Sequence, residues 1–234
     1  MTSRTVALVP AAGRGLRMGG SVPKQFLTIG GLPLVVHSLR VLQAAPVIDG
    51  VILAVPEAEI GYCQSQIILP HGFTKVTHIV PGGVERQDSV RHALAAVAED
   101  IEIVLVHDAV RPFITTRMVE EVVSAARASG AAIIALPMRD TVKQVGSDRV
   151  IERTVDRRSL WLAQTPQAFR RDWLSEAHQK AHLEGVQATD DAFLIEWFGR
   201  PVSVVEGSGE NIKVTRPEDL TIGEAIWTSR RSVA

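Results

Sequence analysis

A glycine-rich loop near the amino terminus carries the clearest chemistry in the sequence. It follows the apolar run 6–9 and has the sequence Pro-Ala-Ala-Gly-Arg-Gly-Leu-Arg-Met, from residue 10 to residue 18. Small residues and glycines allow backbone N–H groups to approach an anionic ligand closely. Arg17 and Lys24 add two positive charges, one as a planar fork for phosphate oxygens and one as a mobile point charge. The segment is therefore predicted to hold a triphosphate.

The spacing of this loop excludes two common phosphate-binding motifs. A Walker A loop needs a Gly-Lys pair, whereas Lys24 follows a proline, nine residues after Gly15. A dinucleotide-binding loop needs a third glycine where this chain has Met18, and the acid after the next strand, Glu57, comes too late. An ordinary strand-to-helix turn would require neither cation. The loop instead resembles the signature of sugar-phosphate nucleotidyltransferases.

A second candidate group ends the apolar run 103–107, where His107 is followed by Asp108 and then by Arg111. A carboxylate at the end of a strand can bind Mg²⁺, which keeps several waters and bridges to phosphate oxygens. Arg111 is a candidate to hold a second phosphate. His107 is expected to be a hydrogen-bonded structural residue rather than an acid or a base.

Three further stretches combine charged or flexible residues with predicted helix starts. The pair Gly82-Gly83 could present N–H groups to a base edge or a phosphate, although Asp88 nearby is equally explained as a helix cap. The acids of Thr189-Asp190-Asp191 are explained as a cap and a complement to the helix dipole. Lys213 lies in an apolar stretch expected to end a strand, and a buried ammonium group needs an anionic partner.

The elements that must position these residues alternate between strands and helices. This alternation predicts an α/β fold, a Rossmann-like and mostly parallel sheet with helices on both faces, and ligands at the carboxyl ends of the strands. The expected strands are 6–9, 51–55, 76–80, 103–107, 132–136 and 202–205, and the expected helices are 34–44, 88–98, 116–128, 172–183 and 191–198.

Residues 138–161 break this rhythm with a polar, alternating pattern around the turn sequence Gly146-Ser147-Asp148. The pattern predicts a β-hairpin that protrudes from the main sheet. Because an isolated hairpin is marginally stable in water, we expect it to pack on a partner subunit, with a solvent-exposed flap as the alternative.

Composition limits the possible partners. A chain of 234 residues with a net charge of −1 has no overall field that would recruit nucleic acid or an anionic membrane. No apolar run is long enough for a membrane span, and no signal-peptide pattern is present. Cys63 is the only cysteine, which excludes an internal disulfide and a cysteine-based zinc site. A single domain over residues 1–234 in the cytoplasm is expected.

Together these motifs, from Pro10 to Asp219, closely resemble those of the 2-C-methyl-D-erythritol 4-phosphate cytidylyltransferase family. The resemblance implies a homodimer, formed through an arm at 138–161, that binds CTP and a polyol phosphate with Mg²⁺ or another divalent cation. It implies catalytic roles for Arg17, Lys24 and Lys213, and a metal ligand at Asp108. The implied CTP-binding residues are Pro10, Ala11, Ala12, Gly13, Gly83, Arg86, Ser89 and Ala109, with Gly83, Arg86 and Ser89 in the part that selects cytosine. The implied acceptor-binding residues are Asp108, Arg111, Thr141, Arg157, Thr165, Thr189 and Lys213, of which Thr141 and Arg157 would come from the partner's arm.

Three alternatives stay open at this point. A D-ribitol 5-phosphate cytidylyltransferase shares the first loop and the sequence His-Asp-Ala-Val-Arg-Pro, although residues 154–157 and 213–219 favour the methylerythritol family. A nucleotide-binding regulatory protein without catalysis is disfavoured because the charged residues of the site are all present. An NAD-dependent oxidoreductase is disfavoured by the missing third glycine.

Overall fold

A seven-stranded sheet forms the centre of the computed structural model, which describes residues 4–13 and 22–233. Strand β10 runs antiparallel to both of its neighbours, and the other neighbouring strands are parallel. The predicted mostly parallel α/β fold is thus confirmed. In spatial order the strands are β11 (Ser203–Glu206), β7 (Ala131–Pro137), β10 (Trp161–Arg170), β6 (Ile101–Val106), β1 (Arg4–Pro10), β4 (Gly50–Val55) and β5 (Val76–Pro81).

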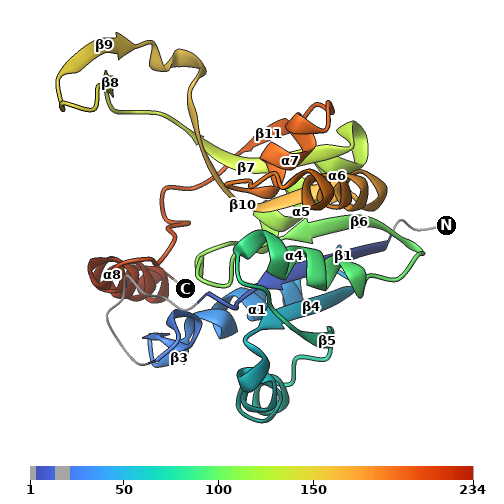
Figure 1. The fold of residues 1–234 in the computed structure, drawn as a ribbon. Coiled ribbons are helices and arrows are strands. Elements are labelled where there is room, and N and C mark those ends of the chain that lie inside the picture. The colour runs from blue at the N-terminus through green and yellow to red at the C-terminus, as the bar shows by residue number, and fades with distance from the viewer. Residues whose placement is uncertain (1–3, 14–21, 234) are drawn as a thin grey trace.

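Helices cover both faces of this sheet (Figure 1). Side chains of β1 alternate between the two layers, with Ala7 and Val9 in one core and Val6 and Leu8 in the other, because successive residues of a strand point to opposite faces. The first core is covered by α1 (Leu34–Ala44), α5 (Thr116–Ser129) and a helical segment made of α2 (Ile60–Tyr62), a π-helical stretch (Cys63–Ile68) and α3 (Leu69–His71). The second is covered by α4 (Arg86–Ala95), α6 (Arg171–Glu184) and α7 (Asp191–Trp197).

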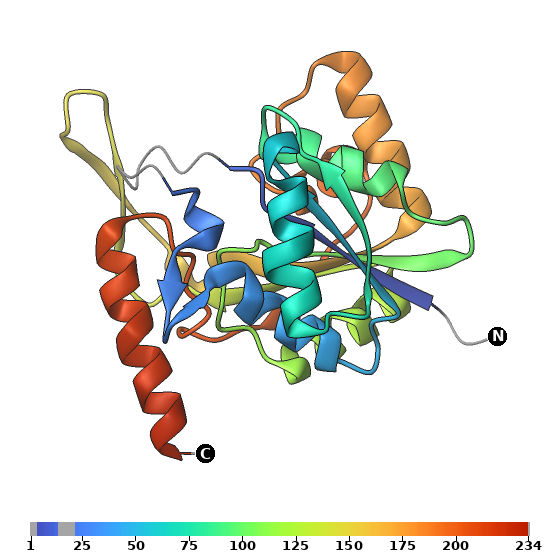
Figure 2. The same ribbon diagram turned by 90° about the horizontal axis from the view of Figure 1, so that it is seen from below.

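The last helix, α8 (Pro217–Val233), lies beside the sheet and packs on a short hairpin, β2 (Thr28–Ile29) and β3 (Leu32–Pro33) (Figure 2). The predicted strand around Lys213 is wrong: residues 211–215 form a loop that leads into α8. The loop is held by its own contacts, since Val214 is fully buried and its N–H group donates to the Val110 carbonyl at 2.9 Å. No helix in the described ranges is both long and apolar enough to cross a membrane.

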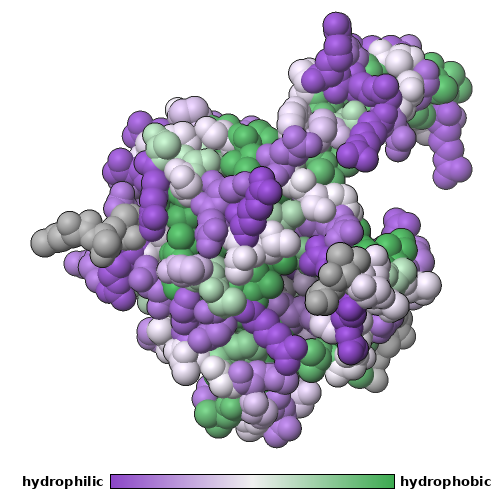
Figure 3. All heavy atoms as spheres, turned by 180° about the vertical axis from the view of Figure 1, so that it is seen from behind, coloured by the Kyte–Doolittle hydropathy of each residue, from purple (hydrophilic) through white to green (hydrophobic). Residues whose placement is uncertain are grey.

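The predicted hairpin is confirmed as an arm of β8 (Val142–Val145) and β9 (Ile151–Val155), with Val142 opposite Val155. The arm stands away from the body of the molecule (Figures 1 and 3). Within the described residues, β8 and β9 form a separate two-stranded sheet. Its apolar side chains Val145, Val150 and Ile151 are about half exposed.

Strand β10 was not predicted, although it occupies a central position between β7 and β6. Its middle carries Gln164, Thr165 and Gln167, which are polar yet at most 7% exposed. These residues interrupt the apolar pattern of a buried strand, and the pairing with β7 shifts register between Ala163 and Gln167. Polar side chains at the centre of a sheet are a sign that the strand serves a site.

Candidate active site

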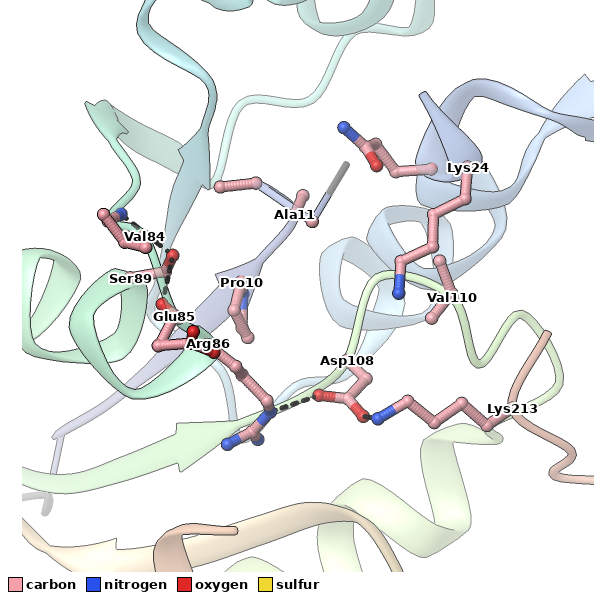
Figure 4. A pocket seen from close by; sticks show the side chains of 14 residues that line it. Pro10, Ala11, Lys24, Val84, Glu85, Arg86, Ser89, Asp108, Val110 and Lys213 are labelled. Atoms are coloured by element: carbon pink, nitrogen blue, oxygen red, sulfur yellow. Dashed lines mark hydrogen bonds and ion pairs between the residues drawn. The ribbon is translucent and has the colours of Figure 1, made fainter. Parts of the chain in front are cut away.

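The loop that follows β1 lines a cavity of about 300 Å³ at the carboxyl ends of the parallel strands. The cavity brings together most of the predicted CTP-binding residues, and Figure 4 shows their side chains. Ala109 is the exception among the described ones, because it is buried just behind the wall and its carbonyl accepts a hydrogen bond from Ser38. Arg17 lies outside the described residues. The predicted residues along the wall are Pro10, Ala11, Ala12, Gly13, Lys24, Gly83, Arg86, Ser89, Asp108 and Lys213.

Glycines allow the walls of this cavity to approach each other closely. A Cβ on Gly83 would lie 2.1 Å from Cβ of Asp88, and one on Gly13 would lie 3.1 Å from Cε of Lys24. The side chain of Lys24 therefore passes so close to the loop that any side chain at position 13 would crowd it. The absence of a side chain at these two glycines is needed for this packing and for access to the backbone.

The start of α4 forms the opposite wall. Glu85 is the N-cap, and the Asp88 carboxylate accepts from the Glu85 N–H group at 3.2 Å, so Asp88 completes a capping box rather than acting as the cap itself. Ser89 Oγ accepts from the Gly83 N–H group at 3.0 Å and donates to the Glu85 carbonyl at 3.2 Å. These bonds hold the glycine pair against the helix and leave Arg86 to reach across the cavity.

Asp108 is the electrostatic centre of the site. Its carboxylate accepts from Arg86 Nε at 2.8 Å and pairs with Lys213 Nζ at 2.7 Å (Figure 4). Arg111 Nε lies 4.0 Å away. Lys213 thus has the anionic partner that its sequence context predicted. Burial alone would raise the pKa of Asp108, but the charges of Arg86 and Lys213 outweigh burial and hold that pKa well below its usual range. Asp108 is therefore an anion at every physiological pH.

His107 has the structural role predicted for it. Its Nε2 group donates to the Arg111 carbonyl at 3.2 Å, so Nδ1 of the neutral ring accepts from Thr165 Oγ1 at 3.0 Å. Thr165 Oγ1 in turn accepts from the Asp108 N–H group at 3.0 Å. Burial lowers the pKa of His107 to about 4, although neighbouring Asp108 opposes that shift. The neutral ring fixes the backbone on both sides of Asp108.

A second cavity, of about 220 Å³, adjoins the first and shares Arg86, Asp108 and Lys213 with it. Its other lining residues include three of the predicted acceptor-binding residues, Arg111, Thr165 and Thr189. Thr141 and Arg157 do not line it: both lie at the base of the arm, where Arg157 Nη1 donates to the Arg139 carbonyl. In a single chain the two cavities therefore adjoin each other, but two of the predicted acceptor-binding residues, Thr141 and Arg157, lie outside both.

Sequence reasoning missed several polar residues of this second cavity. Gln164 and Gln167 line it, and Asn211, which is fully buried, donates to Gln164 Oε1 at 3.2 Å and to the Thr165 carbonyl at 2.9 Å. Asn211 also accepts from Arg111 through its carbonyl, at 2.9 Å. The only available signal was the concentration of amides around Thr165.

The described residues support neither a catalytic cysteine nor an enclosed metal site. Burial raises the pKa of Cys63 to about 11, which keeps its thiol protonated. Among the described residues, no group of three or more His, Cys, Asp or Glu side chains could hold a metal ion. Any cation at Asp108 would need other ligands from substrates and water.

Comparison with known proteins agrees with this geometry. The family model described as 2-C-methyl-D-erythritol 4-phosphate cytidylyltransferase matches residues 5–229. A protein of that name from Syntrophus aciditrophicus is 50% identical over 226 residues, which cover 97% of each chain. A bifunctional enzyme IspD/IspF from Desulforudis audaxviator is 47% identical over 95% of this chain and 56% of its own length. The crystal structure of a 4-diphosphocytidyl-2C-methyl-D-erythritol synthase from Anaerococcus prevotii superposes with a TM-score of 0.84 at 30% identity, covering 97% of this chain and 96% of that one.

Because His107 is buried, the stability of the folded protein should depend on pH, and a substitution at His107 can test this. Its pKa is about 4 in the folded protein against 6.5 in the unfolded chain, so the unfolded state binds more protons between these values. Its contribution to stability is complete above pH 6.5 and is lost as the pH falls toward 4. Between pH 7 and pH 5 this loss is about 2 kcal/mol.

The measurement is urea unfolding of the wild type and of His107→Gln at pH 7 and at pH 5. The variant lacks the titrating ring, so its free energy of unfolding should fall by about 2 kcal/mol less than that of the wild type. Equal decreases in the two proteins would show that His107 is not held neutral.

Proposed function

Because the chain belongs to the 2-C-methyl-D-erythritol 4-phosphate cytidylyltransferase family, we propose that it transfers the cytidylyl group of CTP to 2-C-methyl-D-erythritol 4-phosphate. The products are 4-diphosphocytidyl-2-C-methyl-D-erythritol and pyrophosphate. The observation that carries this proposal is the pair of adjoining cavities, which share Arg86, Asp108 and Lys213. The first would hold CTP and the second the acceptor phosphate, so that the two polyanions meet at the shared wall.

The transfer needs orientation and charge neutralisation more than proton transfer. A phosphate monoester has a second pKa near 6, so the attacking oxygen is already ionised near neutral pH. That oxygen forms a bond to the α-phosphorus of CTP, the bond to the β-phosphate bridging oxygen breaks, and pyrophosphate leaves. Lys24, Arg17 and Lys213 are the cations proposed to stabilise the charge of this transition state, and neutral His107 takes no proton in the reaction.

We propose that Asp108 holds Mg²⁺ or another divalent cation together with phosphate oxygens and water. The donor set fits such an ion, because Asp108 stays ionised, lines both cavities, and has acceptor sites beyond its bonds to Arg86 and Lys213. When bound, the ion would neutralise part of the triphosphate charge.

We also propose one domain over residues 1–234 that forms a homodimer through the arm at 138–161, and a cytoplasmic location. Exposed apolar residues on the arm, Val145, Val150 and Ile151, favour a partner surface. In a single chain, Thr141 and Arg157 do not line the proposed acceptor site, and a partner's arm would supply them.

Pyrophosphate release with purified protein tests the activity. With CTP and 2-C-methyl-D-erythritol 4-phosphate, kcat/KM should exceed the values for UTP, or for D-ribitol 5-phosphate as acceptor, by at least about 100-fold, because a site built to bind polar groups rejects analogues that leave those groups unpaired. Faster turnover of ribitol phosphate, or CTP binding without release of pyrophosphate from any acceptor, would overturn the proposal.

Lys24→Ala separates transition-state stabilisation from substrate binding. We expect kcat to fall by about 100- to 1,000-fold while the Kd for CTP rises by less than about tenfold, since the charge to be stabilised grows as pyrophosphate departs. Steady-state kinetics and calorimetric titration with CTP provide the two numbers. Lys75→Ala is the matched control, because Lys75 donates to the Ala45 carbonyl and lines neither cavity. Equal losses in kcat and affinity would mean that Lys24 contributes only uniform binding.

Mixing two nearly inactive variants tests whether the arm completes a neighbouring site. Arg157→Ala and Lys24→Ala are each expected to keep only a small residual activity as homodimers. After subunit exchange, a heterodimer has one site with both residues intact only if Arg157 acts in the neighbouring subunit, which predicts recovery of about a quarter of the wild-type activity at equal mixing. Absence of any recovery, despite exchange shown by differently tagged subunits, would place Arg157 in its own chain's site.

A further inference from the structure

A buried chain of charged groups connects the shared wall of the two cavities to helices α6 and α7. Arg86 Nη1 donates to Asp191 Oδ2 at 2.7 Å, and His178 Nε2 lies 3.0 Å from Asp191 Oδ1. Asp191 and His178 are each only 1% exposed. Arg86 thereby bridges two buried carboxylates, Asp108 at the site and Asp191 behind it.

The sequence explains the two acids at the start of α7 as a cap and a complement to the helix dipole, and Asp191 is not the cap. Asp190 is the N-cap of α7, and its Oδ1 accepts from the Phe193 N–H group at 3.0 Å. Both oxygens of Asp191 point instead to side chains of other helices. Burial would raise the pKa of Asp191, but Arg86 and the hydrogen bond from His178 outweigh it and lower that pKa, so the carboxylate stays charged.

Such a buried charged pair contributes little to stability as such. The surroundings are apolar: Leu174, Ala177 and Ala181 of α6 lie in the same core as Ala192 and Ile195 of α7. Removing two charges from water costs several kcal/mol for each, and apolar residues of similar volume often stabilise a fold at least as well. A functional role for the network is therefore the better explanation.

The guanidinium of Arg86 supplies that role. Nε is bonded to Asp108 and Nη1 to Asp191, whereas Nη2 is buried without a hydrogen-bond partner in the described part of the chain. Arg86 lines both cavities, at the wall where the acceptor phosphate and the α-phosphate would meet. A phosphate oxygen is the acceptor that best matches a fixed guanidinium N–H group.

We propose that Asp191, oriented by His178, is a positioning residue that fixes the Arg86 guanidinium against Asp108 at the wall shared by the two cavities, where the acceptor phosphate would bind. The inference rests on the proposed function and deepens it: Arg86 acts on the phosphates rather than on the cytosine base. Asp191 also anchors the start of α7, next to Thr189 of the second cavity. The effect should therefore fall on turnover and on acceptor binding, and spare the binding of CTP.

The first test is Asp191→Asn, which keeps the shape of the side chain and removes its charge. We expect kcat to fall about 10- to 100-fold, because small misplacements of a catalytic group have effects of this size, and KM for the acceptor to rise. KM for CTP should stay within about twofold of the wild-type value. Asp172→Asn is the matched control: Asp172 lies at the exposed start of α6 and pairs with Arg170.

A double-variant cycle shows whether Asp191 acts through Arg86. Arg86→Gln should lower kcat strongly, and adding Asp191→Asn to it should lower kcat by less than about twofold more, since residues acting as a unit are not additive. Losses that multiply would overturn the proposal. So would an Asp191→Asn enzyme whose kcat and acceptor KM are both within twofold of the wild type.

Variants of His178 decide the question even if the Asp191 variant does not fold. His178→Gln keeps an N–H donor within reach of Asp191 and should retain kcat within about threefold, whereas His178→Leu suits the apolar face of α6 and should lose kcat about as Asp191→Asn does. Thermal unfolding of both variants checks their stability. Equal kcat values for the two would assign His178 a structural role and overturn the proposal, whereas a wild type that releases no pyrophosphate would refute the activity itself.

Discussion

The buried carboxylate of Asp108 is the constraint on which the site depends. It is 5% exposed, and a charge so far from water is tolerated only when cations compensate it. Those cations come from three separate segments: Arg86 from the start of α4, Arg111 from the loop after β6, and Lys213 from the loop before α8. Each segment must therefore end at the same point in space, which is the point where the two cavities join.

The fold meets this requirement by ending its parallel strands at one edge and adding one antiparallel strand among them. β10 brings Thr165 beside His107, and the pair fixes the backbone of Asp108. Asn211 bonds β10 and Arg111 to the loop that carries Lys213. The bonds among His107, Thr165 and Asn211 join neutral buried groups, and the Asn211 carbonyl accepts from the Arg111 guanidinium, so these residues hold the charged groups in place without adding charge of their own.

The sequence predicts the parts of this arrangement that are local. Apolar periodicity marks the sheet strands except β10, glycines mark the nucleotide loop, and an alternating polar pattern marks the arm, because each depends on neighbours within a few residues. β10 was not predicted because the polar residues in the middle of the strand, which serve the site, interrupt the apolar pattern of a buried strand. The loop at 211–215 resembles a strand because its apolar residues pack against α8 and the loop after β6 rather than in the sheet. The pair of Arg86 and Asp191 joins residues far apart in the chain, and only tertiary packing brings them together.

The charge balance of the site follows from the same constraint. The cluster at the shared wall has three cations and two carboxylates. The cations are Arg86, Arg111 and Lys213, and the carboxylates are Asp108 and Asp191, so the cluster has a net positive charge. The two carboxylates hold the cations in a fixed geometry, and the surplus favours polyanionic ligands over water at this wall. Because the cations are oriented before any ligand arrives, they need little reorganisation when negative charge moves onto a leaving group. A buried anion thus serves an anion-binding site: it costs stability, and in return it fixes the donors that stabilise the transition state.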